Sequence, residues 1–99
     1  MELIVNLHLL SPEEGGRSTP IASGYRAGMF FEPDANGGND GILTIRDGDT
    51  CAPGETCTGS IRPLRPDLLP QSVKQSASFE LREGWRVVAK GLVMDVVRD

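Results

Sequence analysis

The chain has 99 residues, a formal net charge of −4, 12 glycines and 7 prolines. A chain this short predicts one small domain spanning residues 1–99, and it excludes a nucleotide-binding domain built from repeated βαβ units. With 38% hydrophobic and 24% charged residues it is typical of a folded globule. The net negative charge disfavours nonspecific nucleic-acid binding, because that binding requires basic side chains to neutralise phosphates. Residues 61–99 are mildly basic and could contact a polyanion locally.

Period-two alternation of apolar residues dominates the sequence, and helix signals are scarce. In chain order we expect strands over residues 3–9, 25–31, 42–46, 57–64, 78–82 and 86–97. A long polar loop reaching Pro20 follows the first strand, and residues 33–41 have a turn-forming composition. The last strand is apolar on both parities around Gly91, which predicts either burial on two sides or a bend there. Six short strands separated by glycine and proline indicate a small barrel or a sandwich.

Three collinear stretches resemble one family. EGGRSTP at residues 14–20, followed by GYR at 24–26, is similar to the EGGRHTPF and GYRP segment in the third, C-terminal domain of bacterial elongation factor Tu. APGE at 52–55 resembles the PGD turn of that domain, and FELREGWR at 79–86 resembles its FAIREGGR. The resemblance extends from about Leu3 to Val97. It implies an all-β fold, a six-stranded antiparallel closed barrel.

The resemblance also bears on activity. In the factor, this barrel packs on a GTPase domain and helps to hold the T-stem of aminoacyl-tRNA. These 99 residues contain no GxxxxGK[ST] phosphate loop, so we expect no GTP binding, no enzymatic activity and no cofactor. Ser18 replaces a family histidine. Trp85 replaces the second glycine of REGG, where the family's backbone approaches tRNA, and its indole would obstruct a phosphate contact although it could stack.

These observations favour a non-enzymatic binding module that acts through a protein partner or by self-association. Other domains cover one flank of the barrel in the factor, and a free-standing copy must cover that flank or make it polar. The candidate exposed apolar residues are Ile21, Met29, Trp85, Leu92 and Met94. Trp85 is either an exposed hot spot beside Arg86 or a side chain folded over the barrel mouth.

The alternative is a translation-associated accessory protein that binds tRNA or another RNA through basic side chains. The candidate interaction residues for the two hypotheses together are Arg17, Tyr25, Arg26, Arg82, Trp85, Arg86 and Lys90. A structural role is the favoured interpretation for three of them. Arg17 would fix its own loop by an internal ion pair, and Tyr25 and Arg26 would belong to the barrel.

The two cysteines, Cys51 and Cys57, bracket a Pro-Gly turn. A disulfide across this hairpin is geometrically possible, but it would close only a small loop, so we expect reduced thiols. The only histidine, His8, is expected to be a half-exposed strand residue, neither a catalytic base nor a zinc ligand.

Two further classes of site are not expected. An EF-hand loop counted from Asp34 would need glycine and glutamate where the chain has Asn39 and Ile45, so this segment is interpreted as a hairpin tip without calcium. The N-terminus has no basic region, and no apolar run approaches the length of a membrane span. We therefore expect a cytoplasmic protein that does not bind membranes.

Overall fold

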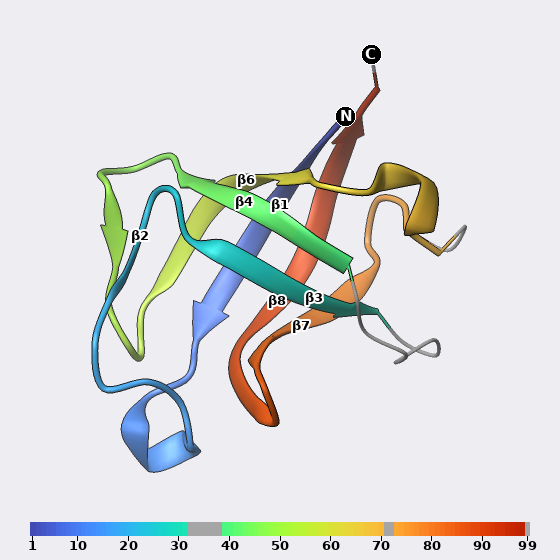
Figure 1. The fold of residues 1–99 in the computed structure, drawn as a ribbon. Coiled ribbons are helices and arrows are strands. Elements are labelled where there is room, and N and C mark those ends of the chain that lie inside the picture. Colours follow the sequence, from blue (N-terminus) through green and yellow to red (C-terminus); the bar gives the residue numbers. More distant parts are fainter. Residues whose placement is uncertain (32–38, 71–72, 99) are drawn as a thin grey trace.

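The structure is a computed structural model that describes residues 1–31, 39–70 and 73–98. Its core is a closed barrel of six strands (Figure 1). The barrel strands are β1 (Glu2–Leu9), β3 (Arg26–Phe31), β4 (Asn39–Ile45), β6 (Thr56–Pro63), β7 (Ser78–Glu83) and β8 (Arg86–Val97). The remaining elements are the short strands β2 (Ile21–Ala22) and β5 (Thr50–Cys51) and the 3₁₀ helices η1 (Pro12–Glu14) and η2 (Pro66–Leu68).

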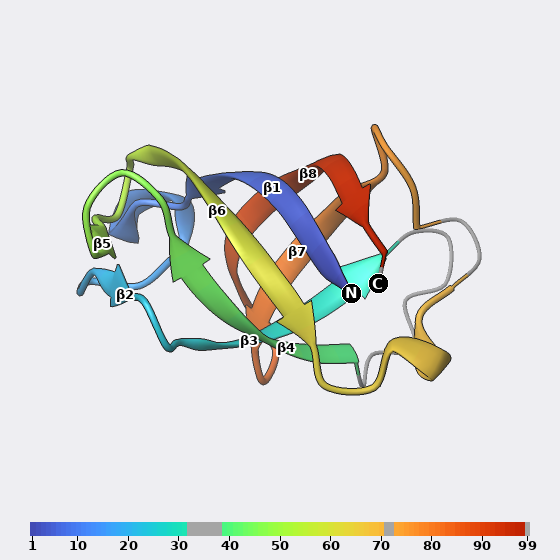
Figure 2. The same ribbon diagram turned by 90° about the horizontal axis from the view of Figure 1, so that it is seen from above.

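The barrel strands follow the order β1-β6-β4-β3-β7-β8, and β8 pairs with β1 to close the ring. Every pair is antiparallel. Glu2 lies opposite Val97, so both ends of the chain meet at one end of the barrel, as the view from above shows (Figure 2). The predicted all-β closed barrel is confirmed, and the sandwich is excluded.

Alternation along each strand supplies the core. In β1, Leu3, Val5, Leu7 and Leu9 are fully buried, while the residues between them are half-buried or exposed. Phe31 of β3 and Phe79 of β7 meet inside the barrel with their ring centres 5.1 Å apart. A continuous set of inward apolar side chains therefore fills the barrel, as is typical of small closed barrels.

The structure corrects several sequence-based boundaries. β4 begins at Asn39, so the segment interpreted as a turn ends earlier than predicted. The candidate calcium loop and hairpin tip lie mostly outside the described residues. The long polar loop contains η1, where the Ser11 hydroxyl accepts a hydrogen bond from the Glu14 backbone and the Glu14 carboxylate accepts one from the Ser11 backbone. The β2–β5 ribbon was not predicted, because two-residue strands carry no periodicity.

β8 contains two β-bulges, and these explain its unusual sequence pattern. Its register against β7 shifts beside Val88, and its register against β1 shifts beside Met94. Each bulge adds one residue and reverses the inward and outward alternation. The neighbours Val88 and Ala89 are consequently both buried at the first bulge, and the neighbours Met94 and Asp95 are both exposed at the second. The strand is thus bent rather than buried on two sides, and the two bulges flank Gly91.

Gly91 makes room for an aromatic ring. It lies opposite Phe79 in β7, and a Cβ atom at this position would come within 2.3 Å of Phe79 Cζ. The Phe79 ring therefore covers the bare backbone of Gly91 and is only 3% exposed. This close approach needs a residue without a side chain, because interior packing tolerates no such overlap.

We predict that Gly91→Ala lowers the free energy of unfolding by about 1–3 kcal/mol, because Phe79 must leave its packed position. Chemical denaturation would measure the loss. Lys90→Ala, at the neighbouring exposed position, should change stability by less than about 0.5 kcal/mol. In a Phe79→Leu background the Gly91→Ala penalty should shrink, and an unchanged penalty there would contradict the proposed overlap.

Candidate interaction surface

A polar cluster joins the loop after η1 to the β7–β8 hairpin. Arg17 forms an ion pair with Glu83, at the end of β7, through Nη1 and Oε2. The Tyr25 hydroxyl donates to the same carboxylate oxygen at 2.8 Å. The Arg17 guanidinium also lies 5.5 Å from the centre of the Tyr25 ring, within the range of a cation–π contact. Glu83 is therefore held from two sides by residues far away in the sequence.

Arg17 also closes its own loop. Its Nε donates to the Thr19 carbonyl at 3.3 Å, and its Nη2 donates to Thr19 Oγ1 at 3.0 Å and to the Pro20 carbonyl at 3.4 Å. The Arg17 side chain is only 22% exposed. The sequence-based interpretation of an internal ion pair thus describes the observed contacts of Arg17.

Two further candidate arginines are paired with carboxylates on the barrel wall. Arg26 of β3 binds Asp40 of β4 through Nε and Nη2, at 3.0 and 2.9 Å. Arg82 of β7 binds Glu80 at 2.7 Å, and its guanidinium lies 4.5 Å from the centre of the Phe30 ring. The two carboxylates offset positive charge that would otherwise attract the phosphates of an RNA backbone.

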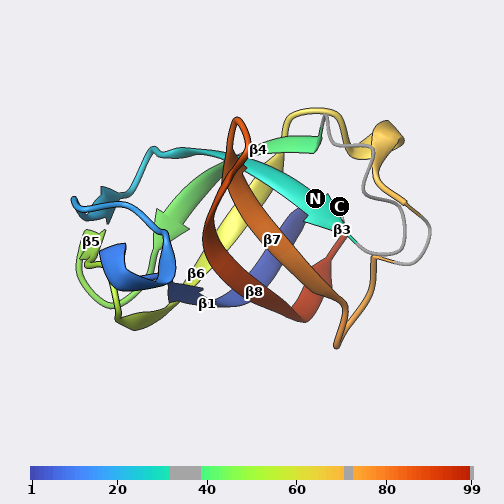
Figure 3. The same ribbon diagram turned by 90° about the horizontal axis from the view of Figure 1, so that it is seen from below.

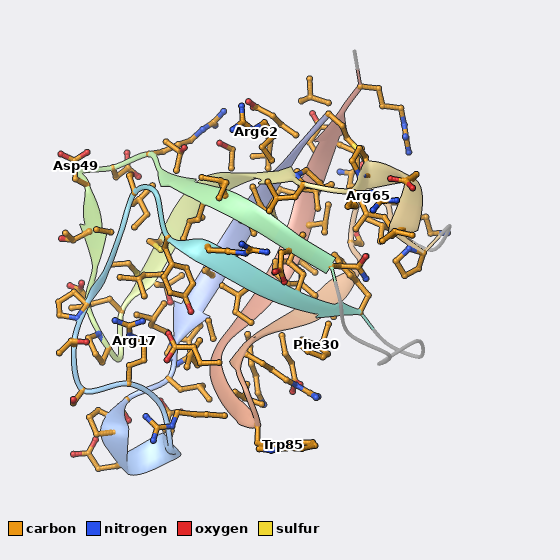
Figure 4. All side chains as sticks on the ribbon, in the orientation of Figure 1. Arg17, Phe30, Asp49, Arg62, Arg65 and Trp85 are labelled. Atoms are coloured by element: carbon orange, nitrogen blue, oxygen red, sulfur yellow. The ribbon has the colours of Figure 1, made fainter. Side chains whose placement is uncertain are left out.

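Trp85 stands apart from every such contact among the described residues. It lies in the tight turn between β7 and β8, and its side chain is 99% exposed. The turn projects as a narrow loop in the view from below, and the indole points away from the barrel (Figures 3 and 4). The interpretation in which Trp85 folds over the barrel mouth is wrong. Arg86, the next residue, is also exposed, as is Lys90 further along β8.

The structure contradicts part of the predicted set of exposed apolar residues. Ile21 is 1% exposed because β2 pairs with β5 and turns this side chain into the core. Met29 is fully buried because it shares the inward parity of Ala27 and Phe31 on β3. Leu92 and Met94 are exposed, as expected. The structure adds three exposed apolar side chains that sequence reasoning missed, namely Leu64, Leu68 and Val97.

The remaining candidate ligands and nucleophiles are His8 and the two cysteines. His8 is half-exposed, as predicted, with Nε2 3.6 Å from Glu14 and Nδ1 3.3 Å from Thr56 Oγ1. Cys51 and Cys57 are free thiols, as predicted. Across the described ranges, no group of three or more His, Cys, Asp or Glu side chains is placed to hold a metal ion. No helix in the same ranges is long and apolar enough to cross a membrane.

Fold and surface together define a small closed β-barrel in which Arg17, Arg26 and Arg82 are paired with carboxylates and an almost fully exposed tryptophan lies at a hairpin tip. The family model described as the elongation factor Tu C-terminal domain matches residues 2–97. The chain belongs to this family, and the resemblance found in its motifs is confirmed over nearly its whole length.

We predict that Arg17→Lys lowers the free energy of unfolding by about 1–2 kcal/mol, because an ammonium group cannot reach Glu83, Thr19 and Pro20 at once. Thermal or chemical denaturation would measure this loss. Arg26→Lys is the matched control, since that ion pair is exposed and should be worth less than about 1 kcal/mol. Equal losses at the two positions would show that Arg17 does not organise the loop.

Tyr25 provides a spectroscopic test of the same cluster. Burial raises the pKa of its phenol to about 12, and the hydrogen bond to Glu83 and the charge of Glu83 add to the shift. Because Tyr25 is the only tyrosine, tyrosinate absorbance reports this pKa directly. Since the pKa in the folded protein exceeds the usual tyrosine value of 10.0, the neutral phenol stabilises the fold below pH 10, and this stabilisation is lost between pH 10 and 12.

In Glu83→Gln the midpoint of the Tyr25 titration should fall, because the negative charge that opposes ionisation is removed. Glu80→Gln is the control, because Glu80 binds Arg82 and not Tyr25. A midpoint that stays at the wild-type value in Glu83→Gln would be inconsistent with the observed hydrogen bond.

Proposed function

We propose that this chain is a non-enzymatic binding module that docks on a protein surface through the tip of its β7–β8 hairpin, with Trp85 as the anchor. The observation that carries the proposal is the exposure of the whole indole. Tryptophan and arginine are the residues most enriched among interface hot spots, and Trp85 is followed directly by the exposed Arg86. The absence of a phosphate loop from the 99 residues supports a role without GTP hydrolysis.

The base of the hairpin supports this role because it is fixed before any partner arrives. Glu83 immediately precedes the turn, and Arg17 and Tyr25 hold its carboxylate. A tip on an anchored base loses less conformational entropy on binding than a free loop would. The partner surface that fits is an apolar pocket for the indole with an acidic rim opposite Arg86. Such a surface belongs either to another protein or to a second copy of this chain.

The RNA hypothesis has weaker support. Arg17, Arg26 and Arg82 each contact a carboxylate of this chain. Arg86 and Lys90 are the candidate cations without an ion pair among the described residues, and the net charge is −4. Complex formation with tRNA that weakens steeply as salt is added would favour RNA over protein. The absence of a complex at low salt would remove the RNA hypothesis.

The test uses the single tryptophan as its reporter. Sedimentation across a concentration series measures self-association, and affinity capture followed by titration of the purified partner measures heterologous binding. In either case the Trp85 emission should shift to shorter wavelength as the indole leaves water. Trp85→Ala should weaken the complex by at least about 2 kcal/mol, or about 30-fold in Kd.

Leu68→Ala serves as the control, because Leu68 is an exposed apolar residue in η2 rather than in the hairpin. Its complex should keep wild-type affinity. A complex that forms with unchanged Trp85 emission, or that survives Trp85→Ala at full affinity, would overturn the assignment of the hairpin tip.

A further inference from the structure

A polar depression with a volume of about 370 Å³ lies where β5 and β6 meet the turn between them. Both cysteines of the chain line it, together with Asn6, Asp47, Thr50, Glu55, Thr56 and Thr58. Cys51 is 1% exposed, whereas Cys57 is half-buried and accessible from the depression. The two sulfur atoms therefore differ in access to solvent although they share one site.

The two thiols interact with each other. Burial raises the pKa of both thiols, and their interaction adds to the rise for Cys51 and offsets part of the rise for Cys57. The Cys51 S–H donates to the Glu55 backbone carbonyl, with Sγ and the oxygen 3.9 Å apart. Between the two cysteines the chain reverses direction, since the Glu55 backbone donates to the Ala52 carbonyl at 3.0 Å. The turn thus brings both thiols to the same depression.

Burial sets the order of reactivity. It raises the pKa of both thiols, that of Cys51 to about 12, and the charge of Glu55 raises both further. The thiolate is the attacking species in disulfide exchange, and Cys57 is the thiol with the better access to solvent. Cys57 is accordingly the entry thiol and Cys51 the resolving thiol.

We propose that Cys57 and Cys51 form a dithiol modification site that exchanges with small disulfides carrying positive charge. The Cys57 thiolate attacks one sulfur of the disulfide, forms a mixed disulfide and releases one thiolate. Cys51 then loses its proton to solvent and attacks Cys57 Sγ, which releases the second thiolate and forms the Cys51–Cys57 disulfide. The protein loses two electrons, and the small disulfide is reduced to two thiols.

The preference for cations follows from the lining. Asp47 and Glu55 are the charged residues among those that line the depression, and both are acidic. A cationic disulfide gains local concentration at such a surface, and an uncharged one does not. This attraction is screened by salt, so its contribution to the rate is measurable separately from the reactivity of the thiols.

The experiment uses the intact chain with cystamine as the cationic disulfide and 2-hydroxyethyl disulfide as the neutral one, followed by mass spectrometry. We expect a transient adduct on Cys57, then a final product that has lost two hydrogen atoms and carries no adduct. In Cys51→Ser the adduct should persist, and in Cys57→Ser modification should be slower, because the remaining thiol is buried. Added salt should slow cystamine and leave the neutral probe unchanged.

Glu55→Gln provides the charge control, since an amide oxygen can keep the hydrogen bond that Glu55 Oε1 accepts from the Ala52 backbone. In this variant the ratio of the cystamine rate to the neutral-probe rate should fall. The proposal is overturned if wild-type protein stops at the mixed disulfide, if Cys51 is modified first, or if salt affects the two probes equally. These outcomes do not depend on Trp85, so they leave the proposed binding function untouched.

Discussion

The pairing of β8 with both β7 and β1 is the constraint on which the barrel depends. β8 is the longest strand, and it must satisfy the backbone groups of two neighbours while the wall curves around the core. The bulges beside Val88 and Met94 supply that curvature, because each adds a residue on one strand only. Between the two bulges, the absence of a side chain at Gly91 leaves room for the Phe79 ring. Closure also removes the exposed sheet edges that would otherwise pair with other chains.

The second organising interaction is electrostatic. The Glu83 carboxylate accepts hydrogen bonds from Arg17 and Tyr25, and this cluster joins the long first loop to the hairpin that carries Trp85. Arg17, in the EGGR stretch that resembles the family, therefore makes structural contacts in this chain. Arg26 and Arg82 also form ion pairs with acidic neighbours, so three of the five candidate cations for RNA binding already contact a carboxylate of this chain.

The six barrel strands could be predicted because alternation and glycine or proline breaks are local signals. The fold class followed from three motifs in the same order as in the family, later matched over residues 2–97. The capping box Ser11–Glu14 was equally readable, and it would have located η1 within the polar loop.

The site was harder to predict. Met29, Phe30 and Phe31 are three consecutive apolar residues, so alternation alone did not reveal which of them points inward. Ile21 is buried only because β2 pairs with β5, some 30 residues later. The partner of Arg17 is 66 residues away, and no local pattern could name it. The exposure of Trp85 was undecidable in sequence for the same reason, since it depends on what the rest of the barrel leaves uncovered.

The pairing of Glu2 with Val97 has a practical consequence. Both ends of the chain leave the barrel side by side, and the Trp85 hairpin lies at the other end of the molecule (Figures 1 and 4). A tag, a surface tether or a second domain attached at either end would therefore keep clear of the indole. A short peptide could also connect the two ends into a ring, which would confine the unfolded chain while leaving the barrel geometry intact.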